Sequence, residues 1–181
     1  MVCAKCAKCA KCVQNLRISP KEVHTCLGRS GRNQPEKLAS PALLEFAGIP
    51  PATVLCYPLT SQIAEKLHAY TRPYAGGESS RVRDFVDILL IASLANLSSQ
   101  KLSEAIKITF EVRATHDVPK ELPKPPASWA APYNRLAREL NLTWQTIDDA
   151  WQAATYFLHP VLDGTSKAIW DPASWSWSGF Q

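Results

Sequence analysis

The chain has 181 residues, of which 46% are hydrophobic and 20% charged, and a formal net charge of +4. This length and composition place it among soluble globular proteins with one core. The longest apolar run, FVDILLIASLANL, contains Asp87 and is too short to span a bilayer, and the N-terminus lacks a signal-peptide apolar segment. We therefore expect a cytoplasmic protein with no membrane association.

The positive charge is concentrated at the N-terminus. Residues 1–40 hold 8 Lys and Arg against 2 Asp and Glu, whereas residues 41–181 hold 12 against 14. A basic segment with few large apolar residues is typical of a disordered tail. We predict a low-complexity, disordered tail at 1–40 and a folded region at 41–181, so the charge gives no evidence of nucleic-acid binding by the body.

The tail begins with MVCAKCAKCAKCV, which spaces four thiols evenly (Cys3, Cys6, Cys9 and Cys12). Thiols at C-x2-C spacing can bind zinc or an iron–sulfur cluster. However, the last interval is too short for the ferredoxin pattern, and Val13 stands where that pattern has proline. We favour low-complexity duplication, and keep a metal-binding cysteine tail as an alternative.

The first folded segments combine a short extended piece with two helices. Gly48–Pro51 predicts a turn, and 53–57 an extended strand-like piece. Residues 60–70 carry apolar side chains at helical spacing, and Pro73 must end that helix. Residues 81–97, which Ser79 or Ser80 could cap, are apolar on most sides, so this second helix should lie in the middle of the domain.

The next segment is a helix followed by a proline-rich strap. Ser98 or Ser99 can cap a helix over 100–113, which has one apolar side. Residues 114–129, ATHDVPKELPKPPASW, contain four prolines and predict an extended strap that lies across the helices.

The C-terminal part predicts two helices and an irregular end. The helices cover 131–140 and 144–158, the second capped by Thr143. The Trp-rich segment 159–181 should be irregular, with its rings packed on the body and their N–H groups near polar partners. The predicted fold class is therefore mainly α.

Four cations surround the glycine pair of the RPYAGGESSR loop, namely Lys66, Arg72, Arg81 and Arg83. Such a cluster can cradle a phosphate group, because guanidinium and ammonium groups bind phosphate oxygens. A solvated basic loop would show the same charges. The charges alone leave both interpretations open.

Asp84 and Asp87 lie three positions apart and so share a helix face. Asp84 falls in the first turn, where the helix dipole favours a carboxylate. Asp87 is flanked by apolar residues and needs a cation, which Arg83 or Lys66 could supply. His116, in the strap, could donate a hydrogen bond towards the same site or be an ordinary surface histidine.

Two runs resemble a known family: YPLTSQIAEKLHAYTRPYAGGESSRVRDFVDILLIAS and AIKITFEVRATHDVPKELPKPPASWAAPYNRLAREL. Together they resemble the C-terminal part of the AbiEii/AbiGii-type nucleotidyltransferase toxins of bacterial type IV toxin–antitoxin and abortive-infection systems. The resemblance runs from about Leu43 to Trp177. Its motifs are a K-L-x-A-x-x-x-R-like helix, an R-D-x-x-D helix and a T-H-x-x-P strap, in that order.

The resemblance implies the helical C-terminal portion of an α+β nucleotidyltransferase-like fold. It implies transfer of a nucleotide from a nucleoside triphosphate (NTP) to an acceptor, with RNA the acceptor class, Mg²⁺ as cofactor and a cognate antitoxin as partner. It also implies that Lys66 binds the triphosphate and that Asp84 and Asp87 form the late acidic motif. Arg72 or Arg83 would assist with phosphate charge. Lys66 and Asp87 should then approach each other across their two helices.

The family's first motif, a Gly-Ser followed by acidic metal ligands, has no match in residues 1–40. We therefore expect a truncated enzyme that is inactive alone and lacks metal ligands of its own. A second interpretation is a non-catalytic helical module that binds a partner such as the antitoxin.

Overall fold

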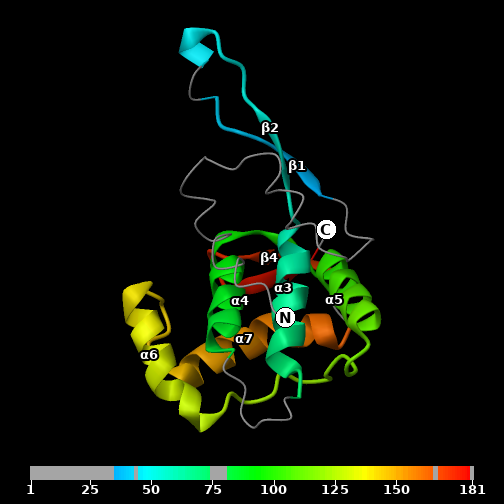
Figure 1. Cartoon of the computed structure of the whole chain (residues 1–181), viewed down its shortest axis with the longest axis vertical. Coiled ribbons are helices and arrows are strands. Elements are labelled where there is room, and N and C mark those ends of the chain that lie inside the picture. Colours follow the sequence, from blue (N-terminus) through cyan, green and yellow to red (C-terminus); the bar gives the residue numbers. More distant parts are fainter. Residues whose placement is uncertain (1–34, 43–44, 74–80, 165–166, 180–181) are drawn as a thin grey trace. The chain divides into compact units, whose positions relative to one another are not determined.

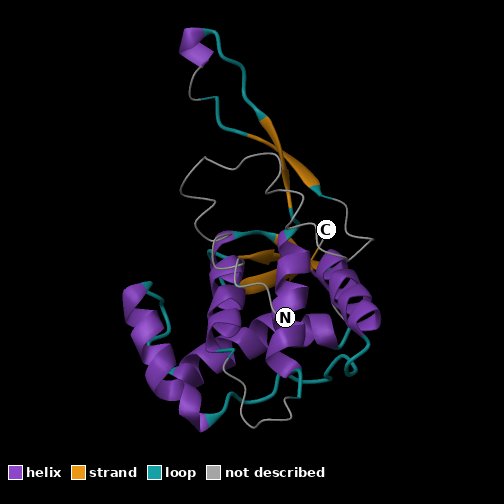
Figure 2. Cartoon of the chain, in the orientation of Figure 1, coloured by secondary structure: helices purple, strands orange, loops and turns teal. Residues whose placement is uncertain are grey.

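Helices dominate this computed structural model, which describes residues 35–42, 45–73, 81–164 and 167–179 (Figure 2). The predicted mainly α fold class is confirmed. The α-helices are α3 (Leu59–Thr71), α4 (Val82–Leu94), α5 (Ser99–Arg113), α6 (Ala130–Glu139) and α7 (Ile147–Leu162). Short 3-10 helices cover η2 (Glu45–Ala47) and η3 (Ala127–Trp129). The strands are β1 (Glu36–Ala39), β2 (Thr53–Cys56), β3 (Leu97–Ser98), β4 (Ala168–Asp171) and β5 (Ser176–Gly179).

The chain divides into two compact units, Met1–Pro58 and Leu59–Gln181. In the first unit, β1 and β2 pair antiparallel, from Glu36 opposite Cys56 to Ala39 opposite Thr53. This confirms the extended piece at 53–57. Glu36–Ala39, however, falls in the segment predicted to be disordered, and that assignment is wrong for these residues. Its sequence, EKLA, has no strand pattern of its own, so pairing with β2 supplies the strand.

In the second unit, α3 lies between α4 and α5 and packs on both (Figure 1). Ile63, Leu67 and Tyr70 face this core, as their helical spacing predicts. Helix α4 buries six of its thirteen residues and also contacts α6 and α7, in agreement with the central position expected for it. The packing of α3 against α4 is what positions the candidate site.

The ends of helices α4 and α5 agree with the sequence only in part. The Ser98 side chain accepts a hydrogen bond from the Lys101 amide (3.4 Å) and so caps α5. Helix α4 instead begins after Arg81 with no side-chain cap, whereas the predicted caps Ser79 and Ser80 lie outside the described residues. Helix α5 ends at Ala114, whose φ of 45° lies in the left-handed region and turns the chain into the strap.

The sequence predicts an irregular C-terminal segment, but this segment forms strands β4 and β5. They join β3 in a sheet of strand order β3-β4-β5. Asp171 starts the connecting turn, since its carboxylate accepts hydrogen bonds from the amides of Ala173 (3.1 Å) and Ser174 (3.3 Å). The expected packing of the tryptophans, with N–H groups near polar partners, is confirmed for Trp170 and Trp177 but is wrong for Trp175, whose buried Nε1 has no hydrogen-bond partner among the described residues. Trp170 Nε1 donates to the Ala92 carbonyl (2.7 Å) and Trp177 Nε1 to the Phe157 carbonyl (3.0 Å).

Helix α7 begins later and ends later than predicted. Its cap is Thr146, not Thr143, because the Thr146 side chain accepts from the Asp149 amide (3.2 Å). The helix also continues through Pro160 to Leu162. Proline keeps a helical φ but removes its amide bond and crowds the carbonyl four residues earlier; Pro160 lies in the last turn of α7, whose neighbours Phe157, Leu158 and Val161 are buried.

This cap gives a direct test. Thr146→Ala should lower the free energy of unfolding by about 1 kcal/mol, because the first turn of α7 loses a hydrogen-bond acceptor. Thr143→Ala is the matched control and should change it by less than about 0.5 kcal/mol, since Thr143 is exposed and outside the helix. Urea unfolding of both variants measures the difference; equal losses would refute the assignment of the cap.

Candidate functional site

Lys66 on α3 reaches two carboxylates on α4. Its Nζ lies 2.5 Å from Asp87 Oδ2 and 3.5 Å from Asp84 Oδ1. Because Asp84 and Asp87 are three apart on one helix, they face α3 together. The Lys66 side chain is only 17% exposed, whereas that of Asp87 is 34% exposed. The approach of Lys66 and Asp87 predicted from the sequence is therefore present in the structure.

A second cation extends this group. Arg81 Nη1 lies 3.5 Å from Asp84 Oδ2, so Arg81, Asp84, Lys66 and Asp87 form one ionic network, called the Lys66 network below. The partner of Asp87 is thus Lys66 and not Arg83. Arg83 is exposed and makes no ion pair with any residue in the described ranges. Being adjacent to Asp84, it points about a quarter-turn away from it.

The Lys66 network controls the charge of the lysine. Burial by itself would lower the pKa of Lys66, but the hydrogen bond and the charge of Asp87, and then those of Asp84, outweigh burial and raise this pKa. Lys66 therefore carries its positive charge at neutral pH. It offers a fixed cation to any anion that can compete with the carboxylates.

Two further residues considered for the site, Arg72 and His116, lie near the end of α3. The Arg72 amide donates to the His68 carbonyl (3.1 Å), and its side chain is exposed. Its charge lowers the pKa values of both His68 and His116, so it acts near these histidines. His116 hydrogen-bonds to Thr71 (2.8 Å) and Thr115 (3.0 Å). Of the two possibilities left open for His116, these contacts match a hydrogen-bonding residue of the strap and not a donor towards the Lys66 site.

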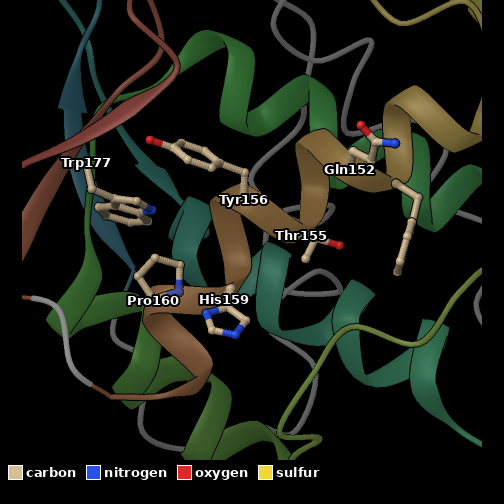
Figure 3. Close-up of a pocket in the computed structure, with 7 residues that line it drawn as sticks. Gln152, Thr155, Tyr156, His159, Pro160 and Trp177 are labelled. Atoms are coloured by element: carbon tan, nitrogen blue, oxygen red, sulfur yellow. The ribbon is translucent and has the colours of Figure 1, made fainter.

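A hollow of about 520 Å³ runs along α7 on the described surface of the second unit (Figure 3). It is mostly aromatic and contains none of the predicted site residues; its lining is Trp151, Gln152, Thr155, Tyr156, His159, Pro160 and Trp177. With no lysine, arginine or carboxylate in its lining, this hollow lacks the charges needed to bind a triphosphate.

The described residues do not fit a metal ion. No group of three or more His, Cys, Asp or Glu side chains within these ranges could hold one. Asp84 and Asp87 are the only carboxylates of the Lys66 network, and Lys66 engages both. A Mg²⁺ site would need oxygen ligands from elsewhere. The cysteine repeat lies outside the described residues.

A fixed lysine beside two carboxylates on a neighbouring helix, one of them also paired with Arg81, is a charge arrangement suited to phosphate chemistry. The family described as nucleotidyl transferase AbiEii toxin, type IV toxin–antitoxin system, matches residues 25–155. That span is well over half of the chain, which therefore belongs to the AbiEii nucleotidyl transferase toxin family. The match begins before Leu43 and ends before Trp177, the limits of the resemblance seen in the sequence. No protein with a curated description matches the chain.

None of the helices within the described residues has the length and apolar character needed to cross a membrane.

Proposed function

We propose that this chain serves the transfer of a nucleotide from an NTP to an RNA acceptor, with Lys66 as the residue that binds the triphosphate. The carrying observation is the 2.5 Å contact between Lys66 Nζ and Asp87 Oδ2 across α3 and α4. This contact holds a charged lysine in place at a partly open position, which is what binding of a phosphate group requires.

In the proposed mechanism the triphosphate replaces Asp87 as the ion-pair partner of Lys66. The Lys66 Nζ remains tethered by Asp84, whose second oxygen is held by Arg81. Asp87 is then released beside the bound phosphate and can accept the proton of the acceptor hydroxyl, as the hydroxyl oxygen bonds to the α-phosphorus and pyrophosphate leaves. Arg72 and Arg83, both exposed, are proposed to add positive charge for the phosphates.

We also propose that the chain alone is inactive or only weakly active. The family chemistry generally needs an NTP and a metal, whereas the described carboxylates do not complete a metal site. The metal ligands would have to come from a separate segment that supplies the Gly-Ser and acidic motif.

Nucleotide binding tests the role of Lys66 independently of turnover. Lys66→Ala should weaken binding of the four NTPs at least about tenfold, because it removes a charged hydrogen bond to phosphate. Arg135→Ala, an exposed cation on α6, is the matched control and should leave binding unchanged. Equilibrium titration with each NTP makes the measurement. Equal binding by wild type and Lys66→Ala would overturn the assignment.

A helical module that binds a partner is the second candidate. It is favoured by one observation, namely that both carboxylates of the Lys66 network are already neutralised within the fold. The partner would be the cognate antitoxin of the type IV system. This candidate predicts no NTP binding by the wild type together with a stable complex when toxin and antitoxin are expressed from one operon.

A further inference from the structure

Two histidines and two threonines join the strap to helix α3. Here "the strap" means residues 114–126, which follow α5. His68 Nε2 lies 2.7 Å from Thr115 Oγ1, and the same hydroxyl lies 3.0 Å from His116 Nδ1. On its other side, His116 Nε2 lies 2.8 Å from Thr71 Oγ1, and Thr71 Oγ1 donates to the Leu67 carbonyl (2.9 Å). The contacts form one continuous chain.

Counting hydrogens fixes the direction of every bond in this chain. The single hydroxyl hydrogen of Thr71 is used on the Leu67 carbonyl, so Thr71 must accept from a hydrogen on His116 Nε2. A neutral His116 then has a lone pair on Nδ1, which accepts from the Thr115 hydroxyl. Thr115 has no second hydrogen and must accept from His68 Nε2. With His116 neutral, both imidazoles therefore carry a hydrogen on Nε2.

An added proton on His116 would break this order. Nδ1 would become a donor, and Thr115 would face two donors, His116 Nδ1 and His68 Nε2, while its own hydrogen would lose its acceptor. Because Thr115 is exposed, its hydrogen would then turn to solvent, and its bond to His116 Nδ1 would be lost. The bond donated by Thr115 to His116 therefore exists only in the neutral state of His116.

The surroundings also oppose a charge on either ring. His68 is 3% exposed and packs against Phe110 (centroids 4.9 Å apart) and His116 (4.7 Å). The charged groups that act on the pair are Arg72 from α3, Arg113 from α5 and Asp117 from the strap. Of these, Asp117 alone is acidic. Glu65, the other nearby acid, is paired with Arg113 (3.7 Å).

We propose that His68, Thr71, Thr115 and His116 form a latch that holds the strap on α3 while both histidines are neutral and releases it on acidification. The electrostatics of the two rings agree with this. Burial, followed by the charges of His116, Arg113 and Arg72, lowers the pKa of His68 from 6.5 to about 4. Burial and Arg72 lower the pKa of His116, against the opposing effect of Asp117.

The direction of the pH effect follows from these lowered values. A released His68 takes up a proton near pH 6.5, whereas in the closed latch it does so only near pH 4. Above pH 6.5 the latch is fully stable, and its stability falls as the pH drops from 6.5 towards 4. Release would also free the contact between Tyr70 Oη and the Pro123 carbonyl, one turn from Lys66 on α3.

Hydrogen exchange of the strap amides in the full chain tests the latch. After correction for intrinsic rates, opening at residues 114–118 should increase about 20-fold between pH 7 and pH 5, because each unit of pKa difference is worth a factor of ten. The double variant His68→Gln/His116→Gln keeps side-chain N–H donors but cannot titrate. Its opening at residues 114–118 should increase less than threefold over the same pH range. His159→Gln, at an exposed histidine on α7, is the control and should respond like wild type. An opening rate independent of pH in the wild type would overturn the latch.

A second measurement needs no variant. Side-chain nitrogen NMR of the wild type should show both His68 and His116 with the hydrogen on Nε2 at pH 7, and both should titrate below pH 6.5. A hydrogen on Nδ1 of either ring, or titration at or above pH 6.5, would refute the proposed hydrogen-bond order.

Discussion

Asp87→Asn should abolish nucleotide incorporation into RNA while leaving NTP binding intact or tighter. The substitution removes the carboxylate that competes with phosphate for Lys66, and it also removes the proposed proton acceptor. Burial lowers the pKa of Lys66, and the hydrogen bond and charge of Asp87 are the largest influences that raise it, so this pKa should fall when they are removed. Lysine acylation between pH 8 and 10 should consequently be faster at Lys66 in the variant than in the wild type.

The measurement pairs an NTP titration with incorporation of labelled nucleotide, in the presence of Mg²⁺ and of a co-expressed segment bearing the Gly-Ser and acidic motif. Asp148→Asn is the matched control, since Asp148 lies on α7 and forms an exposed ion pair with Lys124 of the strap (3.0 Å). Incorporation that survives Asp87→Asn would contradict the role of Asp87. Loss of NTP binding together with incorporation would indicate that Asp87 only supports the local structure.

Trp170→Ala should reduce the free energy of unfolding by about 3–5 kcal/mol. Trp170 has no exposed surface, and its ring meets Phe157 edge-on at 4.8 Å. The substitution opens a large cavity and leaves the Ala92 carbonyl without its donor. Chemical denaturation followed by circular dichroism measures the loss.

Tyr156→Ala on α7 is the control for this experiment. Its side chain is 56% exposed, so removing it should cost less than about 1 kcal/mol. A Trp170→Ala protein as stable as Tyr156→Ala would show that the β4–β5 strands do not complete the core. It would then restore the irregular C-terminus predicted from the sequence.

Local patterns in the sequence predicted most of the helical unit. Helix α3 follows from the apolar spacing of Ile63, Leu67 and Tyr70, and its end from Pro73. The pairing of Lys66 with Asp87 could be anticipated because a carboxylate among apolar residues needs a cation. The resemblance to the AbiEii family favoured Lys66 as this cation, whereas the positions of the charges alone left Arg83 equally possible.

The features that were missed depend on pairing between distant segments. Strand β1 exists because it pairs with β2, and nothing within Glu36–Ala39 indicates a strand. Strands β4 and β5 did leave a signal, the period-two alternation of SWSWS, which the abundance of Trp obscured. The contacts of His116 could not be predicted, because they require the strap to return to α3 across 45 positions of sequence.

The Lys66 network has a consequence for how a nucleotide could arrive. Its two cations and two carboxylates cancel, so the network presents no net positive charge to attract a triphosphate from a distance. A polyanion entering there gains a local hydrogen bond but little long-range attraction. Association should therefore depend only weakly on ionic strength, and the nucleotide should enter more readily when its own counter-ions already offset most of its charge.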